Sequence, residues 1–106
     1  MYVPREAHIA GSKLIEYLLQ PRTRNDKSAF LAQAGFTQDN PEVLESAIRE
    51  LIHVETATSD RVDQYGEYYV VVGKIHGPAG SLEVTTVWIR LHGQNVFRFV
   101  TLKPTR

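Results

Sequence analysis

The chain has 106 residues, of which 42% are apolar and 23% charged, with 12 Lys and Arg balanced by 12 Asp and Glu. This length supports a single hydrophobic core, so we expect one domain over residues 1–106. No apolar run is long enough to span a membrane, and no apolar segment follows a basic one at the N-terminus. The chain has no cysteine, which excludes disulfides and thiolate metal sites and is typical of a cytoplasmic protein.

The charges are segregated although they sum to zero. Residues 1–30 and 68–106 are basic, whereas residues 31–67 are acidic. Such segregation can place a cationic patch on a neutral protein, and phosphate groups bind to such patches. We therefore expect the basic residues of both ends to converge on one side of the molecule, away from three acidic residues of the middle segment. The basic residues are Lys13, Lys27, Arg98 and Lys103, and the acidic residues are Glu42, Glu45 and Glu50.

Three helices are predicted in the first half of the chain. The second begins at Asp26 and ends before Gly35, which supplies a left-handed C-terminal residue. The third has the clearest start, because Asn40 can cap it and Pro41 suits its first position. The first covers residues 12–19 and carries an apolar stripe. That stripe consists of Leu14, Ile15, Leu18 and Leu19.

Strand patterns replace the helical pattern from Val54 onward. Four strands are predicted, over residues 54–58, 66–75, 82–91 and 96–103, with a turn at residues 77–80 between the second and third. Helices followed by strands indicate an α+β fold, in which three N-terminal helices pack on one face of a roughly four-stranded antiparallel sheet.

The last two strands alternate in polarity. In the third strand Thr86, Trp88 and Arg90 share one face. In the fourth, simple alternation puts Phe97, Phe99 and Thr101 on one face and Arg98 on the other. Cations and hydroxyls that project from a rigid sheet are suited to binding phosphate, because the scaffold fixes the donors in place.

Several short motifs, in this order along the chain, resemble a family of small bacterial domains of formally unknown function. In layout that family is similar to the barnase, EndoU, colicin and RelE group of small ribonuclease toxins. The motifs are Lys13, Tyr17, Leu18 and Leu19; Lys27, Phe30, Gly35 and Phe36; Gly66, Tyr68 and Val70; Thr86, Val87 and Trp88; and Arg98, Phe99, Val100 and Thr101.

The resemblance implies a ribonuclease-like domain that cleaves RNA without a metal ion and leaves a cyclic phosphate. One departure matters. Many ribonucleases of the group close with Thr-Ala-Tyr-Pro, whereas this chain has Lys103 in place of the tyrosine. A role for a tyrosine at that position therefore cannot be carried over, and the general base stays unassigned.

Cleavage by the 2′-hydroxyl needs a base, an acid and cations that stabilise the phosphorane oxygens. Arg98 is the best candidate for a phosphate clamp, and the alternative is an ordinary surface cation. Thr101 is a candidate for binding phosphate or a base edge. The alternative is that threonine occurs there only because it is favoured in β-strands. His8 is a natural acid or base, since His titrates near neutral pH, or else an idle surface residue. Lys13 by itself is an ordinary surface lysine, but the resemblance to the family motif makes it a candidate for binding phosphate or acting on the leaving group, and it completes the predicted catalytic set.

Four further residues are predicted to contact RNA. Trp88 could stack on a base, but a tryptophan in a strand is more often part of the core, and we favour the core. No two of the four histidines are spaced for a shared metal ion, and no cofactor motif occurs. The predicted RNA-binding residues are Lys27, Thr86, Arg90 and Lys103.

The leading hypothesis is a metal-independent endoribonuclease, the toxin of a toxin–antitoxin pair, whose partners are RNA and a small acidic antitoxin. The alternative is a non-catalytic module that binds RNA or a protein through the same basic sheet face. A third hypothesis is an adaptor or immunity protein without a nucleic-acid role. Cleavage of RNA would support the first hypothesis, and salt-dependent RNA binding without cleavage would support the second. Neither activity would support the third.

Overall fold

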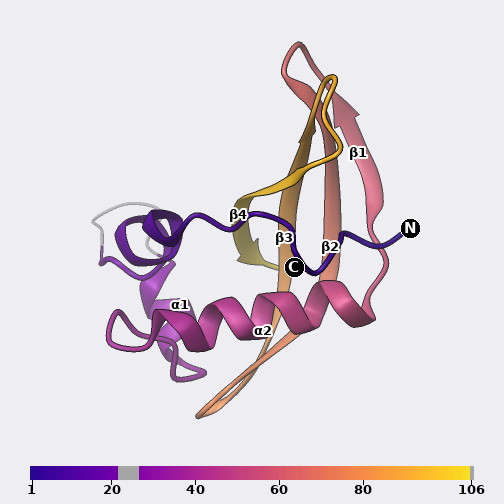
Figure 1. Ribbon diagram of the computed structural model, residues 1–106. Coiled ribbons are helices and arrows are strands. Elements are labelled where there is room, and N and C mark those ends of the chain that lie inside the picture. Colours follow the sequence, from indigo (N-terminus) through magenta and orange to yellow (C-terminus); the bar gives the residue numbers. More distant parts are fainter. Residues whose placement is uncertain (22–26, 106) are drawn as a thin grey trace.

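The computed structural model describes residues 1–21 and 27–105 and shows one long helix against a four-stranded sheet (Figure 1). Residues 22–25, which the polarity of Arg22 and Arg24 predicts to be a basic loop, and the predicted start of the second helix at Asp26 lie outside the described residues. No helix among the described residues is both long enough and apolar enough to cross a membrane.

The long helix, α2 (Pro41–Val54), starts where the sequence predicts, with Pro41 in its first turn. Its buried stripe packs on the sheet and consists of Leu44, Ala47, Ile48, Leu51 and Ile52. Asn40 stands at the cap position, but its side chain does not bond the first turn of the helix. Instead its Oδ1 accepts from the Thr37 N–H at 2.8 Å and its amide donates to the Gly35 carbonyl at 3.1 Å, which closes the preceding loop.

The sheet contains β1 (Thr58–Val62), β2 (Gly66–Gly77), β3 (Gly80–Leu91) and β4 (Phe97–Pro104), in that order and all antiparallel. The long hairpin of β2 and β3 turns at Pro78 and Ala79, which confirms the predicted turn. The first strand begins later than expected, at Thr58, because α2 continues to Val54.

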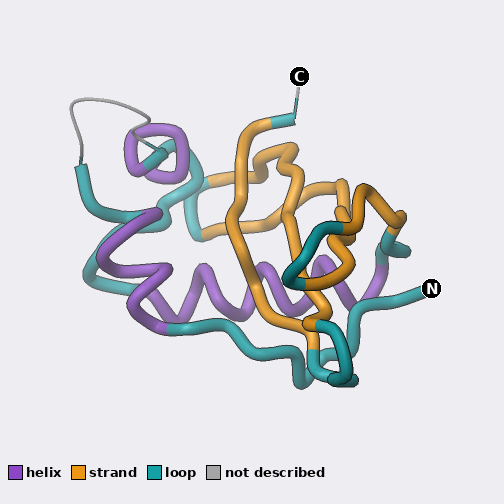
Figure 2. The backbone as a smooth tube through the Cα atoms, turned by 90° about the horizontal axis from the view of Figure 1, so that it is seen from above, coloured by secondary structure: helices purple, strands orange, loops and turns teal. Residues whose placement is uncertain are grey.

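The prediction of three helices packed on the sheet is wrong. Residues expected to form the first helix make a short π-helical piece, η1 (Lys13–Leu18), in which the Leu19 N–H donates to the Leu14 carbonyl. This wider turn leaves Ile15 exposed, while Leu14, Leu18 and Leu19 are buried. The second expected helix shrinks to the five residues of α1 (Ser28–Ala32). Figures 1 and 2 place both pieces beside the first turns of α2 rather than across the strands.

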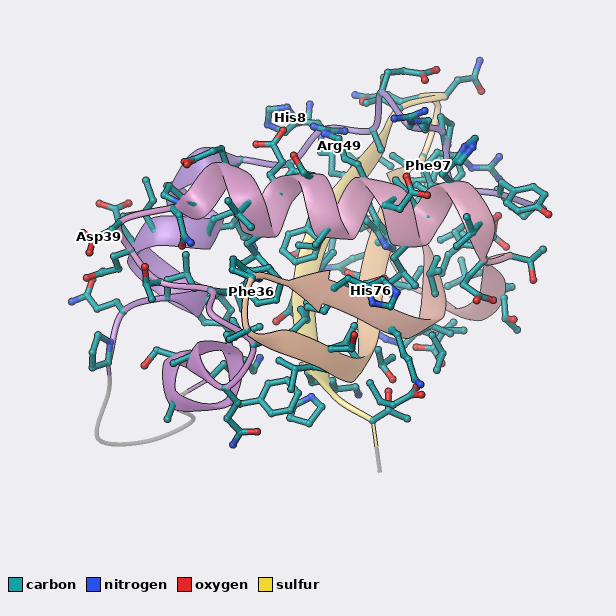
Figure 3. The ribbon with its side chains drawn as sticks, turned by 90° about the horizontal axis from the view of Figure 1, so that it is seen from below. His8, Phe36, Asp39, Arg49, His76 and Phe97 are labelled. Carbon is teal, nitrogen blue, oxygen red and sulfur yellow. The ribbon has the colours of Figure 1, made fainter. Side chains whose placement is uncertain are left out.

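The N-terminal segment takes the place of the missing helices. The Met1 carbonyl accepts from Ala57, which lies just before β1, whereas His8 forms a bridge with Arg98 on β4. The segment therefore spans the width of the sheet and buries Val3, Ala7 and Ile9. Arg49 of α2 donates to the Ala7 carbonyl at 2.9 Å, which ties the segment to the helix (Figure 3).

A β-bulge in β4 changes which side chains share a face. Trp88 pairs with Phe99 and Val87 pairs with Thr101, so Val100 is an extra residue without a partner. Thr101 therefore lies on the Arg98 face, opposite to Phe97 and Phe99, and the predicted facing of Thr101 is wrong. Arg98, Thr101 and Lys103 share the face opposite to that covered by α2.

Candidate functional site

Two segments, one before residue 22 and one after residue 26, meet at β4. Lys27, just before α1, donates from Nζ to the Thr101 hydroxyl at 3.0 Å and to the Tyr17 hydroxyl at 3.4 Å. The same ammonium lies 5.1 Å from the centre of the Tyr17 ring. The Tyr17 phenol is thus held between an ammonium and a hydroxyl.

A second ammonium lies beside this group. Lys13, one helical turn before Tyr17, donates from Nζ to the Val100 carbonyl at 3.0 Å. Val100 is the bulged residue, so the irregularity that turns Thr101 outward also presents a carbonyl to Lys13. We call Lys13, Tyr17, Lys27 and Thr101 the β4 cluster. Three of them line an open groove of about 610 Å³ at this edge of the sheet.

The electrostatic effect of the β4 cluster appears at Tyr17. The pKa of its hydroxyl lies below the ordinary 10.0, first because Thr101 forms a hydrogen bond to it and then because Lys27 does. The charge of Lys13 lowers this pKa further, while partial burial opposes the shift. A phenol in this setting releases its proton more readily than a free tyrosine does.

The other predicted catalytic residues stand further along β4. Arg98 is exposed and lies three residues before Thr101, or ~10 Å along a strand. His8 is exposed too. Its backbone bonds to the residues on either side of Arg98: the His8 N–H donates to the Phe97 carbonyl, and the His8 carbonyl accepts from the Phe99 N–H. Lys103 is exposed near the end of the strand. No salt bridge within the described part of the chain involves Arg98 or Lys103.

Two predicted RNA-binding residues lie on the covered face instead. Thr86 is 0% exposed; its hydroxyl donates to the Val71 carbonyl and accepts from the Trp88 indole. Its side chain therefore has no surface with which to contact RNA. Arg90 is partly exposed but pairs with Glu67 at 2.9 Å, near the end of the sheet. Trp88 is fully buried against Phe99, which confirms its expected place in the core.

The predicted convergence of cations is confirmed at β4. Lys13 and Lys27 both reach the strand that carries Arg98 and Lys103. The three acidic residues of the prediction lie elsewhere: Glu42 and Glu50 line a groove between α2 and β2, and Glu45 pairs with Arg49 on α2. Glu16, however, lines the groove of the β4 cluster. Within residues 1–21 and 27–105, no three side chains of His, Asp or Glu gather closely enough to hold a metal ion.

Sequence reasoning missed Tyr17 as a site residue. The sequence identifies Tyr17 only as part of the motif with Lys13, Leu18 and Leu19. The available signal was its spacing from Lys13, since residues four apart on a helix are neighbours. Nothing local to the sequence indicated that Lys27 and Thr101 would meet at the same phenol.

The comparison with known families agrees with the expected resemblance to a family of unknown function. Residues 4–106 match a family described as a domain of unknown function, DUF6883. The chain belongs to this family. No curated protein and no solved structure matches it. Nothing in these comparisons links a DUF6883 domain to ribonuclease toxins, so that relationship remains a proposal.

Proposed function

We propose that this domain is a metal-independent endoribonuclease whose reaction centre is the β4 cluster. The observation that carries the proposal is the meeting of the Lys27 ammonium, the Tyr17 phenol and the Thr101 hydroxyl, with the Lys13 ammonium beside them. These groups come from three separate segments and include a proton donor or acceptor as well as cations. Phosphodiester cleavage by the 2′-hydroxyl needs both kinds of group.

The chemistry assigns roles to Tyr17 and to the two lysines. Tyr17, once ionised, takes the proton of the 2′-hydroxyl; the 2′-oxygen then bonds to phosphorus while the bond to the 5′-oxygen breaks. The products are a 2′,3′-cyclic phosphate and a 5′-hydroxyl, whose proton comes from an acid such as His8. Lys13 and Lys27 stabilise the phosphorane oxygens. Each ammonium has three donors, so each retains one or two beyond its protein partners.

The reaction should follow the ionisation of Tyr17. Because hydrogen bonds from Thr101 and Lys27 lower its pKa below 10.0, the phenolate fraction begins to rise at a lower pH than in free tyrosine. We expect the cleavage rate to increase with pH up to that lowered pKa and then to level off. Tyr17→Phe should lack this rising limb. An unchanged pH profile in folded Tyr17→Phe would rule out the phenol as the base.

The direct test uses chelator-treated protein and end-labelled RNA. We expect wild type to leave cyclic phosphate ends, and Tyr17→Phe and Lys27→Ala to cut roughly a hundredfold or more slowly. Lys74→Ala is the matched control, because this exposed lysine lines the groove beside α2 on β2, two strands away from β4. Circular dichroism checks the fold of each variant. Absence of cleavage by wild type, or equal rates in all variants, would contradict the proposal.

RNA binding without cleavage is the second candidate. The exposed Arg98 and Lys103, with no salt-bridge partner in the described residues, favour it. It predicts RNA affinity that falls steeply with salt while the RNA stays intact. Under either function, we propose that a small acidic protein covers these cations and acts as the inhibitor.

A further inference from the structure

The backbone of β2 is unpaired along part of its outer edge. β1 begins opposite Val70, so the rest of β2 continues past it, below α2 in Figure 1. The Asp63 N–H donates to the Gly66 carbonyl, so the even-numbered residues of β2 direct their backbone groups toward the β1 side. Beyond β1 the same alternation directs the N–H and C=O groups of Lys74 and His76 outward. Their backbone bonds to no other element within the described residues, and we call this stretch the β2 edge.

A groove of about 520 Å³ separates the β2 edge from α2, with His76 beside the helix (Figure 3). A Cβ atom at Gly73 would meet the Leu51 side chain near the end of α2, whereas Gly77 lies against Phe36, before the helix begins. β2 therefore runs back along the helix, and a strand added at the β2 edge would lie beside both elements. The apolar lining of the groove comes from Val43, Ala47, Leu51 and Val54.

The helix wall of this groove is acidic. Glu42 and Glu50 both line it, both are exposed, and neither takes part in a salt bridge within residues 1–21 and 27–105. On the strand wall, Lys74 stands opposite Glu83 in the β2–β3 ladder, so its charge is balanced within the hairpin. Glu50 follows Glu42 by eight residues, or ~12 Å along a helix. Two side chains four residues apart on an extended segment lie ~13 Å apart, so basic side chains at that spacing match the two carboxylates.

We propose that the groove binds an extended basic segment of a partner protein, which adds a strand to the β2 edge. An apolar side chain of the segment fills the groove, and basic side chains two residues to either side contact Glu42 and Glu50. A second copy of this chain fits poorly, because two-fold pairing of the β2 edge brings Lys74 and the acidic wall against their own copies. The groove lies two strands from β4, and the inference does not depend on the proposed function.

The test uses synthetic peptides and NMR titration. The probe is the capped peptide Lys-Thr-Val-Thr-Lys. One control is Glu-Thr-Val-Thr-Glu, and the other is the lysine peptide methylated on every backbone nitrogen. We expect the lysine peptide to bind roughly tenfold or more tightly than either control, because the first control places like charges on the acidic wall and the second lacks strand donors. Its shifts should fall on residues 42–50 and 72–76.

Variants test the two walls of the groove separately. Glu50→Lys should weaken binding of the lysine peptide roughly tenfold. Glu6→Lys, the same charge change at an exposed position of the N-terminal segment, should leave it unchanged. Lys74→Pro removes an outward N–H without breaking a bond to β3, so it should fold and lose affinity. Lys74→Ala removes the same charge but keeps the N–H, and it should still bind.

The outcomes decide the inference whether or not the protein cleaves RNA. Absence of binding, equal affinity for the lysine and glutamate peptides, or shifts confined to β4 would overturn it. Affinity retained by the methylated peptide would exclude strand addition, even if Lys74→Pro does not fold. Dimerisation of the free protein that Lys74→Pro abolishes would overturn the proposal in favour of a second copy.

Discussion

Two threonines on neighbouring strands show how one residue type takes opposite roles. The Thr86 hydroxyl is buried and satisfies both the Val71 carbonyl and the Trp88 indole. The Thr101 hydroxyl lies at the edge of the sheet and accepts from Lys27. A buried polar group without a partner is costly, so Thr86 has a structural role, whereas Thr101 is available for chemistry.

Thr86→Val should therefore destabilise the protein while leaving the β4 cluster intact. The change keeps the side-chain shape but leaves the buried Trp88 indole N–H without its acceptor, at a cost of ~1–3 kcal/mol. Urea denaturation measures the effect. Thr85→Val is the control, because that hydroxyl pairs with Thr105 at an exposed position, and it should change stability by less than ~0.5 kcal/mol. Equal stability of the two variants would contradict the role assigned to Thr86.

Arg98 and Arg61 provide a second comparison between like residues. Both are exposed, but Arg98 stands on β4 near the β4 cluster, whereas Arg61 bonds Asp63 and stacks 3.9 Å from the centre of the Tyr68 ring. We expect Arg98→Ala to slow RNA cleavage by roughly a hundredfold, and Arg61→Ala to have a far smaller effect. Cleavage of labelled RNA by the two folded variants decides this. Similar rates would mean that Arg98 is an ordinary surface cation.

At the scale of the elements, close packing joins the loop before α2 to the β2–β3 hairpin. The Ala79 N–H donates to the Ala34 carbonyl at 2.9 Å, and Phe36 is fully buried next to Gly77 (Figure 3). A Cβ atom at Gly77 would lie 2.8 Å from the Phe36 ring and would also meet the Ala34 carbonyl. Only glycine lets the two segments approach so closely.

Gly77→Ala should thus push the loop away from the hairpin and destabilise the protein by ~1–3 kcal/mol. Gly11→Ala offers a matched control, since nothing lies within 4 Å of a Cβ atom at that position. Thermal unfolding of both variants measures the difference. A melting temperature for Gly77→Ala at or above that of Gly11→Ala would show that the contact relaxes without cost.

At the scale of the whole molecule, four cations of a neutral chain gather at one edge of the sheet. Lys13 and Lys27 join Arg98 and Lys103 at β4, while α2 presents Glu42 and Glu50 to a different groove. Cations gathered in this way attract polyanions in general, and the acidic inhibitor proposed above would be drawn to β4 for the same reason. We expect such an inhibitor to contact two further cations, Arg22 and Arg24, which lie outside the described residues.

Expression of the protein alone should slow bacterial growth, and an acidic partner should relieve the effect. The reason is that an uninhibited ribonuclease destroys the messages of its host. Growth is followed after induction of wild type, Lys13→Ala and Arg98→Ala at matched protein levels, beside an empty vector. We expect wild type to be the most toxic. Equal growth of all four cultures would count against a toxin, and equal toxicity of the three proteins would exclude Lys13 and Arg98 as its source.

The sequence by itself determined the features that depend on neighbouring residues. Asn40 and Pro41 marked the start of α2, alternation identified the long strands, and the composition of residues 77–80 predicted their turn. Helical and strand periodicities and turn propensities act over a few residues, so they can be read directly from the chain. The same reasoning failed at η1, where a π-helical turn leaves Ile15 exposed.

Only the tertiary structure decided the candidate site. Lys27 and Thr101 are 74 residues apart in the chain, and Tyr17 enters between them from a third segment. The bulge at Val100 turns Thr101 to the Arg98 face, because one extra residue inverts the alternation of every side chain after it. Which face of β3 is covered, and so whether Thr86 is buried, follows from the packing of α2 and the N-terminal segment. Contacts between distant segments depend on register and packing, which local propensity does not encode.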